Sequence, residues 1–131
     1  MKNYFYGTGK RKNAISRVFI KNGNGNFVIN NKKIDIFCRN NFIKENIIIY
    51  PIKIVNLDLK KFDILITVKG GGEFGQIYSI RHGISKALLN YDINYKSILK
   101  KNKLITRDSR KVERKKFGFK KSRKRIQFSK R

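Results

Sequence analysis

The last 25 residues of the chain lack the apolar pattern of a hydrophobic core, and they constrain the fold more than any other segment. Residues 107–131 contain 13 Lys or Arg and two acids, which gives them a net charge of +11. Their few apolar side chains follow neither the helical period nor the strand period. Because like charges repel along such a segment, it needs a polyanionic neighbour to hold it in place. The segment therefore predicts a nucleic-acid partner.

The rest of the chain is basic as well. The 131 residues carry a formal charge of +25, so residues 1–106 contribute +14. Lysine, asparagine and isoleucine are abundant and alanine is rare, which indicates an A+T-rich genome and accounts for part of the lysine content. Arginine is less favoured by that bias, yet six of the ten arginines lie in residues 107–131. A planar guanidinium suits phosphate, so their placement strengthens the prediction.

Composition argues against several other classes of protein. One cysteine, Cys38, allows no disulfide within the chain and no cysteine-based zinc cluster, and we expect it in the core. The N-terminus lacks a secretory signal pattern, and the longest apolar cluster, residues 47–50, is too short to span a bilayer, so we expect no membrane partner. Of the eight acids, none is clearly paired for metal binding or catalysis, and the single histidine, His82, has no second ligand nearby. We expect no enzyme activity, cofactor, metal or small-molecule substrate.

Strand patterns dominate the first part of the chain. Residues 4–10, 16–21 and 27–29 are rich in aromatic and β-branched residues. The Asn-Gly-Asn-Gly run at residues 22–25 predicts a hairpin that pairs the second of these strands with the third. Residues 62–69 alternate between apolar and other residues, which predicts a central strand.

Helical patterns fill most of the remainder. Residues 33–50 favour two short helices that Pro51 ends. Residues 75–91 predict a longer helix with His82 and Lys86 on its solvent-facing side. Its apolar stripe consists of Ile77, Ile80, Ile84, Leu88 and Tyr91.

A shorter helix over residues 95–103 precedes the basic segment. These patterns together predict an α+β domain at residues 1–106, followed by a long, extended, basic C-terminal tail at residues 107–131.

Three ordered groups of motifs carry a more specific signal. The first is YGTGKRK at residues 6–12, and the second is VKGGG at 68–72 with IRHGI at 80–84. The third is TRD at 106–108 with VERKK at 112–116 and QFSKR at 127–131. In this order and spacing, essentially the whole chain resembles the family of bacterial-type ribosomal protein nine of the small ribosomal subunit.

This resemblance implies a four-stranded sheet with helices on one face and a left-handed βαβ crossover, an exception to the usual hand. It implies a place in the head of the small subunit, bound to ribosomal RNA beside neighbouring ribosomal proteins. It also implies that the tail threads through the RNA and reaches peptidyl-site transfer RNA. Ile126 stands where the family usually has proline, which removes a fixed φ before the last five residues. We expect a cytoplasmic ribosome of a bacterium or reduced endosymbiont, or an organelle ribosome.

The basic residues of these segments are the predicted RNA contacts, because Lys and Arg neutralise phosphates and release counterions. The predicted ribosomal RNA contacts are Lys10, Arg11, Lys12, Arg17, Lys69, Arg81, Arg107, Arg110, Lys111, Arg114, Lys115, Lys116, Lys120, Lys121, Arg123, Lys124 and Arg125. The predicted transfer RNA contacts are Ser129, Lys130 and Arg131.

Several alternatives stay open. The glycines at residues 70–72 precede a helix, so their N–H groups suit a phosphate. They are equally well explained as a structural break between a strand and that helix. Phe117, Phe119 and Phe128 suit either stacking on unpaired bases or packing on a neighbouring protein. The alternative function is that of a free-standing nucleic-acid-binding protein without sequence preference, which binds DNA and RNA equally.

Overall fold

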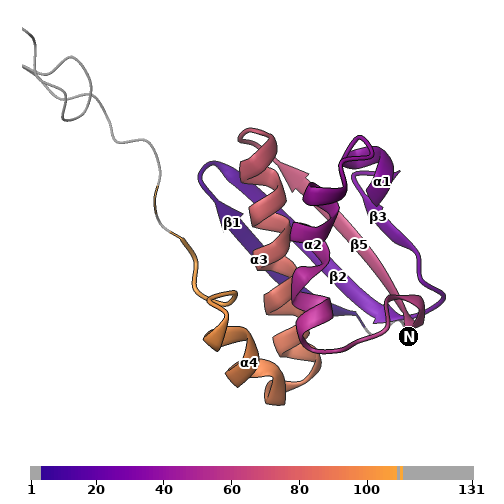
Figure 1. Ribbon diagram of the computed structural model, residues 1–131, viewed down its shortest axis with the longest axis vertical. Coiled ribbons are helices and arrows are strands. Elements are labelled where there is room, and N and C mark those ends of the chain that lie inside the picture. Colours follow the sequence, from indigo (N-terminus) through magenta and orange to yellow (C-terminus); the bar gives the residue numbers. More distant parts are fainter. Residues whose placement is uncertain (1–3, 109, 111–131) are drawn as a thin grey trace, which may run out of the picture.

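A computed structural model describes residues 4–108 and 110 of the chain. Figure 1 shows a sheet with α2 and α3 lying together in front of one face, so the predicted α+β class with helices on one face is confirmed. The predicted RNA contacts at residues 111–131, and the predicted course of the tail, lie outside the described residues. The domain boundary after residue 106 also stays a prediction.

The sheet has five strands in the order β1-β2-β5-β3-β4. The strands are β1 Phe5–Arg11, β2 Ala14–Asn22, β3 Phe27–Ile29, β4 Lys32–Lys33 and β5 Phe62–Lys69. β1, β2 and β5 pair antiparallel, whereas β3 pairs parallel with β5. The four-strand prediction missed β4, because an edge strand of two lysines leaves no alternating pattern to detect.

The predicted hairpin between β2 and β3 is wrong, because β5 lies between these strands and pairs with both. The connection instead passes the start of β5. There the Oδ1 atom of Asp63 accepts hydrogen bonds from the N–H groups of Asn24 at 3.0 Å and Asn26 at 3.1 Å. These bonds lower the pKa of the Asp63 carboxyl. The turn-forming residues thus build a loop around one carboxylate, and long-range pairing with β5 replaces the local hairpin.

The parallel pair β3 and β5 is joined through the helical layer. The chain passes from β3 through β4, α1 Ile34–Phe37, α2 Phe42–Ile54 and the 3-10 turn η1 Leu59–Lys61 to β5. In Figure 1 both strands run upward, α2 lies in front of the sheet, and β5 lies to the left of β3. The crossover is therefore left-handed, as the resemblance implies.

The two helices predicted between residues 33 and 50 are present, but Pro51 does not end the second. α2 begins at the cap residue Asn41, whose side chain accepts hydrogen bonds from two backbone N–H groups, and continues past Pro51 to Ile54. Pro51 and Ile52 are both buried, so packing of this last part of the helix offsets the hydrogen bond that proline cannot donate.

The long helix α3 Glu73–Tyr91 lies directly on β1, and glycines allow this close approach. A Cβ atom at Gly9 would clash with the carbonyl oxygen of Ser79, and one at Gly7 would clash with the carbonyl oxygen of Gly83. The glycines of the first motif therefore lie against a helix. The predicted stripe is confirmed, because Ile77, Ile80, Ile84 and Leu88 are buried.

The core lies between this helical layer and the sheet. As predicted, the even-numbered residues of β5 face the core, and Cys38 is also buried there. The 3-10 turn η2 Ile93–Tyr95 and the short helix α4 Lys96–Lys101 follow α3, close to the helix predicted over residues 95–103. No helix within residues 4–108 is long and apolar enough to cross a membrane.

Candidate nucleic-acid interface

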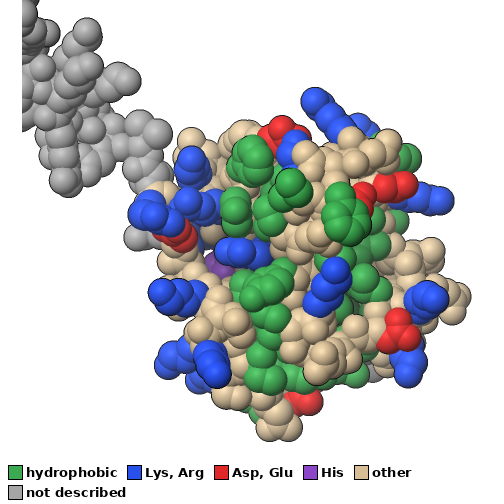
Figure 2. Space-filling view, viewed as in Figure 1, with side chains coloured by type: hydrophobic (Ala, Val, Ile, Leu, Met, Phe, Trp, Pro, Cys, Tyr) green, Lys and Arg blue, Asp and Glu red, His purple; other side chains and the backbone are tan. Residues whose placement is uncertain are grey.

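Most of the predicted RNA contacts that the structure describes fall into two groups. Lys10, Arg11, Arg81 and Arg110 meet around a cavity of about 390 Å³ beside the last described residues, and we call this cavity the tail-root pocket. Its lining consists of Lys10, Arg11, Tyr78, Arg81, His82, Lys103, Leu104, Thr106, Asp108 and Arg110. Figure 2 shows blue Lys and Arg side chains gathered around the purple histidine.

One acid in the pocket joins the start of the basic segment to the domain. The Oδ2 atom of Asp108 lies 3.0 Å from Nη1 of Arg11 and 2.6 Å from Nη2 of Arg110. Arg11 also donates a hydrogen bond to the carbonyl oxygen of Arg110 at 3.3 Å. The hydrogen bonds from Arg110, with smaller help from Arg11, hold the pKa of the Asp108 carboxyl far below its usual range. Asp108 therefore stays charged and ties itself and Arg110 to the end of β1.

His82 lies in the pocket wall rather than on a solvent-facing surface, so that prediction is wrong. The side chain is 7% exposed, because β1 packs on one side of it and residues 104–106 on another. Its Nδ1 atom accepts a hydrogen bond from the N–H of Lys10 at 3.2 Å, and its Nε2 atom donates one to the carbonyl oxygen of Ile105 at 2.8 Å. Both ring nitrogens are thus engaged in holding the pocket together. Lys86, the other residue predicted on this side, is exposed.

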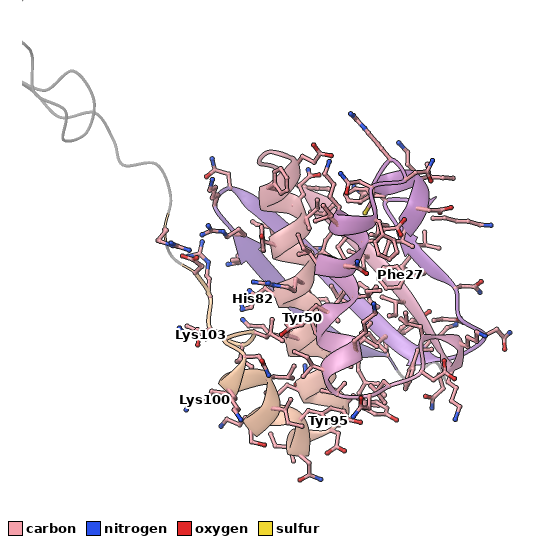
Figure 3. All side chains as sticks on the ribbon, viewed as in Figure 1. Phe27, Tyr50, His82, Tyr95, Lys100 and Lys103 are labelled. Atoms are coloured by element: carbon pink, nitrogen blue, oxygen red, sulfur yellow. The ribbon has the colours of Figure 1, made fainter. Side chains whose placement is uncertain are left out.

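Burial lowers the pKa of His82, although the hydrogen bond to Ile105 acts in the opposite direction. The neighbouring cations Lys86, Arg107 and Arg81 lower this pKa further. The imidazole is therefore neutral at neutral pH, with its proton on Nε2. Figure 3 places His82 and Lys103 on the same side of the helical layer, where the segment after α4 returns to α3.

Arg81 is a half-buried cation on the edge of this pocket. Its guanidinium carbon lies 4.8 Å from the centre of the Tyr78 ring, so one face of the guanidinium stacks on an aromatic surface. Burial lowers its pKa, but an arginine remains charged in proteins. Within residues 4–108 and 110, no carboxylate forms a salt bridge with it. An external anion would supply the missing partner.

The second group of predicted contacts lies on the face of the sheet that the helices leave uncovered. Arg17 pairs with Thr8 and Thr67 across the strands, and Lys69 pairs with Ile15. Arg17 and Lys69 are exposed, and so is Ile15 at 46% of its surface. Lys12, in the turn between β1 and β2, and Arg107 are exposed as well but belong to neither group. The predicted RNA contacts therefore lie on different parts of the surface, although the sequence analysis treated them as one set.

The glycine loop after β5 has a clear structural role. Gly70 and Gly71 have φ values of 80° and 68°, which favour glycine, and the chain turns there from strand to helix. The side chain of Gln76 donates a hydrogen bond to the carbonyl oxygen of Gly70 at 3.1 Å, and Glu73 forms a salt bridge with Lys44. The negative charge of Glu73 in the first turn of α3 opposes a phosphate at this position. A phosphate contact of the loop stays a prediction.

Sequence reasoning missed several residues that build these surfaces. Tyr78 and Lys103 line the pocket only because residues distant in the chain meet there, and no local pattern identifies them. Asp108 was visible within the TRD motif, but its role as an anchor for Arg11 depends on the tertiary fold. The aromatic residues of the uncovered sheet face, Tyr6 and Phe19, were read only as strand formers.

Comparison with known proteins gives one consistent answer. A family model described as ribosomal protein S9/S16 matches residues 9–131. The small ribosomal subunit protein uS9 of Borrelia recurrentis (strain A1) is 50% identical over 129 residues, which cover 98% of this chain and 93% of that protein. These matches extend over the domain, the tail-root pocket and the basic segment alike. The chain therefore belongs to the ribosomal protein S9/S16 family.

Proposed function

We propose that this protein is a structural component of the small ribosomal subunit and that its basic surfaces bind ribosomal RNA. The observation that carries this proposal is the tail-root pocket, where five cations converge around one acid that is already paired twice. Such a surface attracts phosphate, and the release of counterions provides affinity without reading sequence. Membership of the family and the +25 charge of the chain support the same role.

The role that we propose is one of binding and not of catalysis. His82 is the side chain most suited to acid–base chemistry, but both of its ring nitrogens hold other parts of the fold. The exposed cations Lys12, Arg17, Lys69 and Arg107 add to the RNA-binding surface. We infer that neighbouring ribosomal proteins surround the domain in the head of the subunit. The composition favours a ribosome in the cytoplasm of a bacterium or reduced endosymbiont, or in an organelle.

We further propose that the basic tail follows ribosomal RNA and that its last residues reach transfer RNA in the peptidyl site. The support is the net charge of +11 on residues 107–131 and the QFSKR ending that the resemblance identifies. Lys130 offers a mobile point charge, and Arg131 offers a planar fork for one phosphate. The salt bridge between Asp108 and Arg11 holds the described start of this segment against the end of β1.

The contact of the pocket with RNA is testable through salt dependence. The affinity of the full chain for small-subunit ribosomal RNA should fall linearly on a logarithmic salt scale, and Arg81→Gln should reduce that slope by about 0.7–0.9, the loss of one neutralised phosphate. Lys60→Ala is the matched control, because Lys60 is an exposed cation in η1 that belongs to neither group. An unchanged slope for Arg81→Gln would remove Arg81 from the proposed interface.

The contact of the tail with transfer RNA requires a separate experiment. Small subunits assembled with a chain that lacks Ser129, Lys130 and Arg131 should contain normal amounts of this protein but bind peptidyl-site transfer RNA more weakly. Dissociation constants from filter binding give the comparison. Equal affinity of truncated and complete subunits for transfer RNA would reject the contact while leaving the ribosomal RNA contact intact.

A further inference from the structure

The face of the sheet opposite the helices has no covering element within the described residues, although it carries large apolar side chains. Tyr6, Ile15 and Leu65 are 39%, 46% and 44% exposed. Tyr6 and Leu65 flank Phe19 across three adjacent strands and form one continuous apolar row with it, whereas Ile15 lies two rows away, beyond Arg17. A contiguous apolar surface of this kind indicates a binding partner. We call it the open sheet face.

The register of the strands arranges the open sheet face in rows. Tyr6 pairs with Phe19, which pairs with Leu65, and these residues form an aromatic and apolar row. The next row contains Thr8, Arg17 and Thr67, and the row after that contains Lys10, Ile15 and Lys69. Cations therefore lie one row from the aromatic row on β2, as Arg17, and two rows from it on β1 and β5, as Lys10 and Lys69.

The ring of Tyr6 is held in a fixed position on this face. Its hydroxyl accepts a hydrogen bond from Oγ1 of Thr8 at 2.8 Å, which ties the ring along the strand. The ring of Phe19 supports it from the neighbouring strand, with centroids 4.9 Å apart and planes tilted by 49°. Tyr4 packs edge-on against Phe19 at 5.8 Å. A ring ordered in this way loses little further freedom when it binds a flat partner.

The charge of the open sheet face is almost entirely positive. Asp63 is the one acid on it within the described residues, and its carboxylate accepts hydrogen bonds from the backbone of Asn24 and Asn26. Arg17, Lys21 and Lys69 form no salt bridge with another described residue. A purely apolar protein partner would leave these cations buried and unpaired, which is costly. A partner with flat apolar groups and a regular series of anions satisfies both features.

We propose that the open sheet face binds an unpaired stretch of RNA, with bases stacked on Tyr6 and Phe19 and phosphates beside Arg17 and Lys69. This inference rests on the proposed RNA-binding function and adds a surface to it. Exposed aromatic residues on a sheet are a known platform for single-stranded bases, and the flanking cations follow the backbone. The tail-root pocket then holds backbone phosphate, whereas the open sheet face holds bases.

Two probes separate stacking from charge. The first is a single-stranded RNA of about ten nucleotides, and the second is an abasic strand with the same number of phosphates. At about 0.5 M salt, where phosphate contacts are weakened, the full chain should prefer the first strand by at least about five-fold. Tyr6→Ala should remove most of this preference. Tyr50→Ala is the matched control, because Tyr50 is 40% exposed but lies on the helical layer (Figure 3).

The outcomes distinguish this inference from the function on which it rests. Equal binding of the two strands by the unaltered chain would overturn stacking and leave phosphate binding in place. Binding of neither strand at low salt would contradict the RNA-binding function itself. A loss of preference in Tyr50→Ala as large as in Tyr6→Ala would also overturn the assignment to the open sheet face.

A second measurement does not depend on the stability of the alanine variant. A photoreactive phenylalanine derivative at position 6 keeps an aromatic ring there and can be crosslinked within assembled small subunits. The proposal requires that the main product joins position 6 to RNA. A main product that joins position 6 to another protein would show that the open sheet face serves a protein partner, and the proposal would be wrong.

Discussion

At the scale of single residues, the neighbours Arg81 and His82 on α3 differ in charge. Arg81 keeps its charge at the edge of the tail-root pocket and stacks on Tyr78. His82 is buried, and its two hydrogen bonds require the neutral ring. The pocket thus combines a cation available to an external anion with a neutral residue that fixes the surrounding backbone.

Stability should fall as the pH decreases below the usual pKa of histidine, about 6.5. The unfolded chain binds a proton there, whereas burial and the cations Lys86, Arg107 and Arg81 lower the pKa of His82 in the fold. The unfolded state therefore gains protons first, and acid favours unfolding. The melting temperature, measured between about pH 7.5 and 5.5, should decrease more in the unaltered chain than in His82→Gln. Identical pH dependence of the two chains would contradict this role.

Cys38 should react slowly with alkylating agents in the folded protein. Burial, with a smaller contribution from Glu45, raises the pKa of its thiol to about 11. A rise of about two units reduces the reactive thiolate about 100-fold at pH 8, and the side chain is only 1% exposed. Mass spectrometry after iodoacetamide treatment should show modification at least about 100-fold slower in buffer than in urea. Similar rates in the two solvents would place Cys38 outside the core.

At the scale of elements, the contact between β1 and α3 positions both of the proposed RNA-binding surfaces. One face of β1 packs on α3 through Gly7 and Gly9, and its other face presents Tyr6 and Lys10. The end of the same strand carries Arg11, which holds Asp108. A shift of β1 relative to α3 would therefore disturb the tail-root pocket and the open sheet face together.

Substitution of Gly9 tests this contact. Gly9→Ala places a methyl group against the backbone of α3, where neither element can easily move, and should lower the free energy of unfolding by about 2 kcal/mol or more. Gly72→Ser adds a larger side chain where a Cβ atom meets nothing within 4 Å, and serine suits this helix cap. Urea denaturation should show little change for Gly72→Ser, and an equal loss in both variants would argue against close packing at Gly9.

The sequence predicted a helix or strand well where only one face of it is buried and the pattern lies within the element itself. The alternation in β5 identified its buried face, because one side of this strand packs on the helices while the other faces outward. The prediction of a β2–β3 hairpin was wrong because both strands pair with β5, which lies about forty positions away in the chain. A local turn pattern cannot reveal such pairing. The prediction that His82 faces solvent was wrong for a similar reason. β1 and the segment after α4 both cover this side of α3, and both are distant from His82 in the chain.

At the scale of the whole molecule, the candidate site depends on segments that are distant in the chain. The tail-root pocket unites the end of β1, the middle of α3 and residues of the segment 103–108 with Arg110. The motifs identified many of its cations but could not show that Arg17 and Lys69 face a different direction. Total charge and the tail predicted the class of partner. Only the fold distinguishes the tail-root pocket, which we propose binds phosphates, from the open sheet face, which we propose binds bases.

The central claim is that the protein works as part of the small ribosomal subunit rather than as a free nucleic-acid binder. Sedimentation of a lysate through a sucrose gradient at moderate salt, with excess duplex DNA added, tests it most directly. We expect the protein to remain in the small-subunit peak, because the proposed function requires its surfaces and tail to bind a specific RNA structure. Transfer of the protein to the DNA, or its release into the free fraction at that salt concentration, would contradict the account.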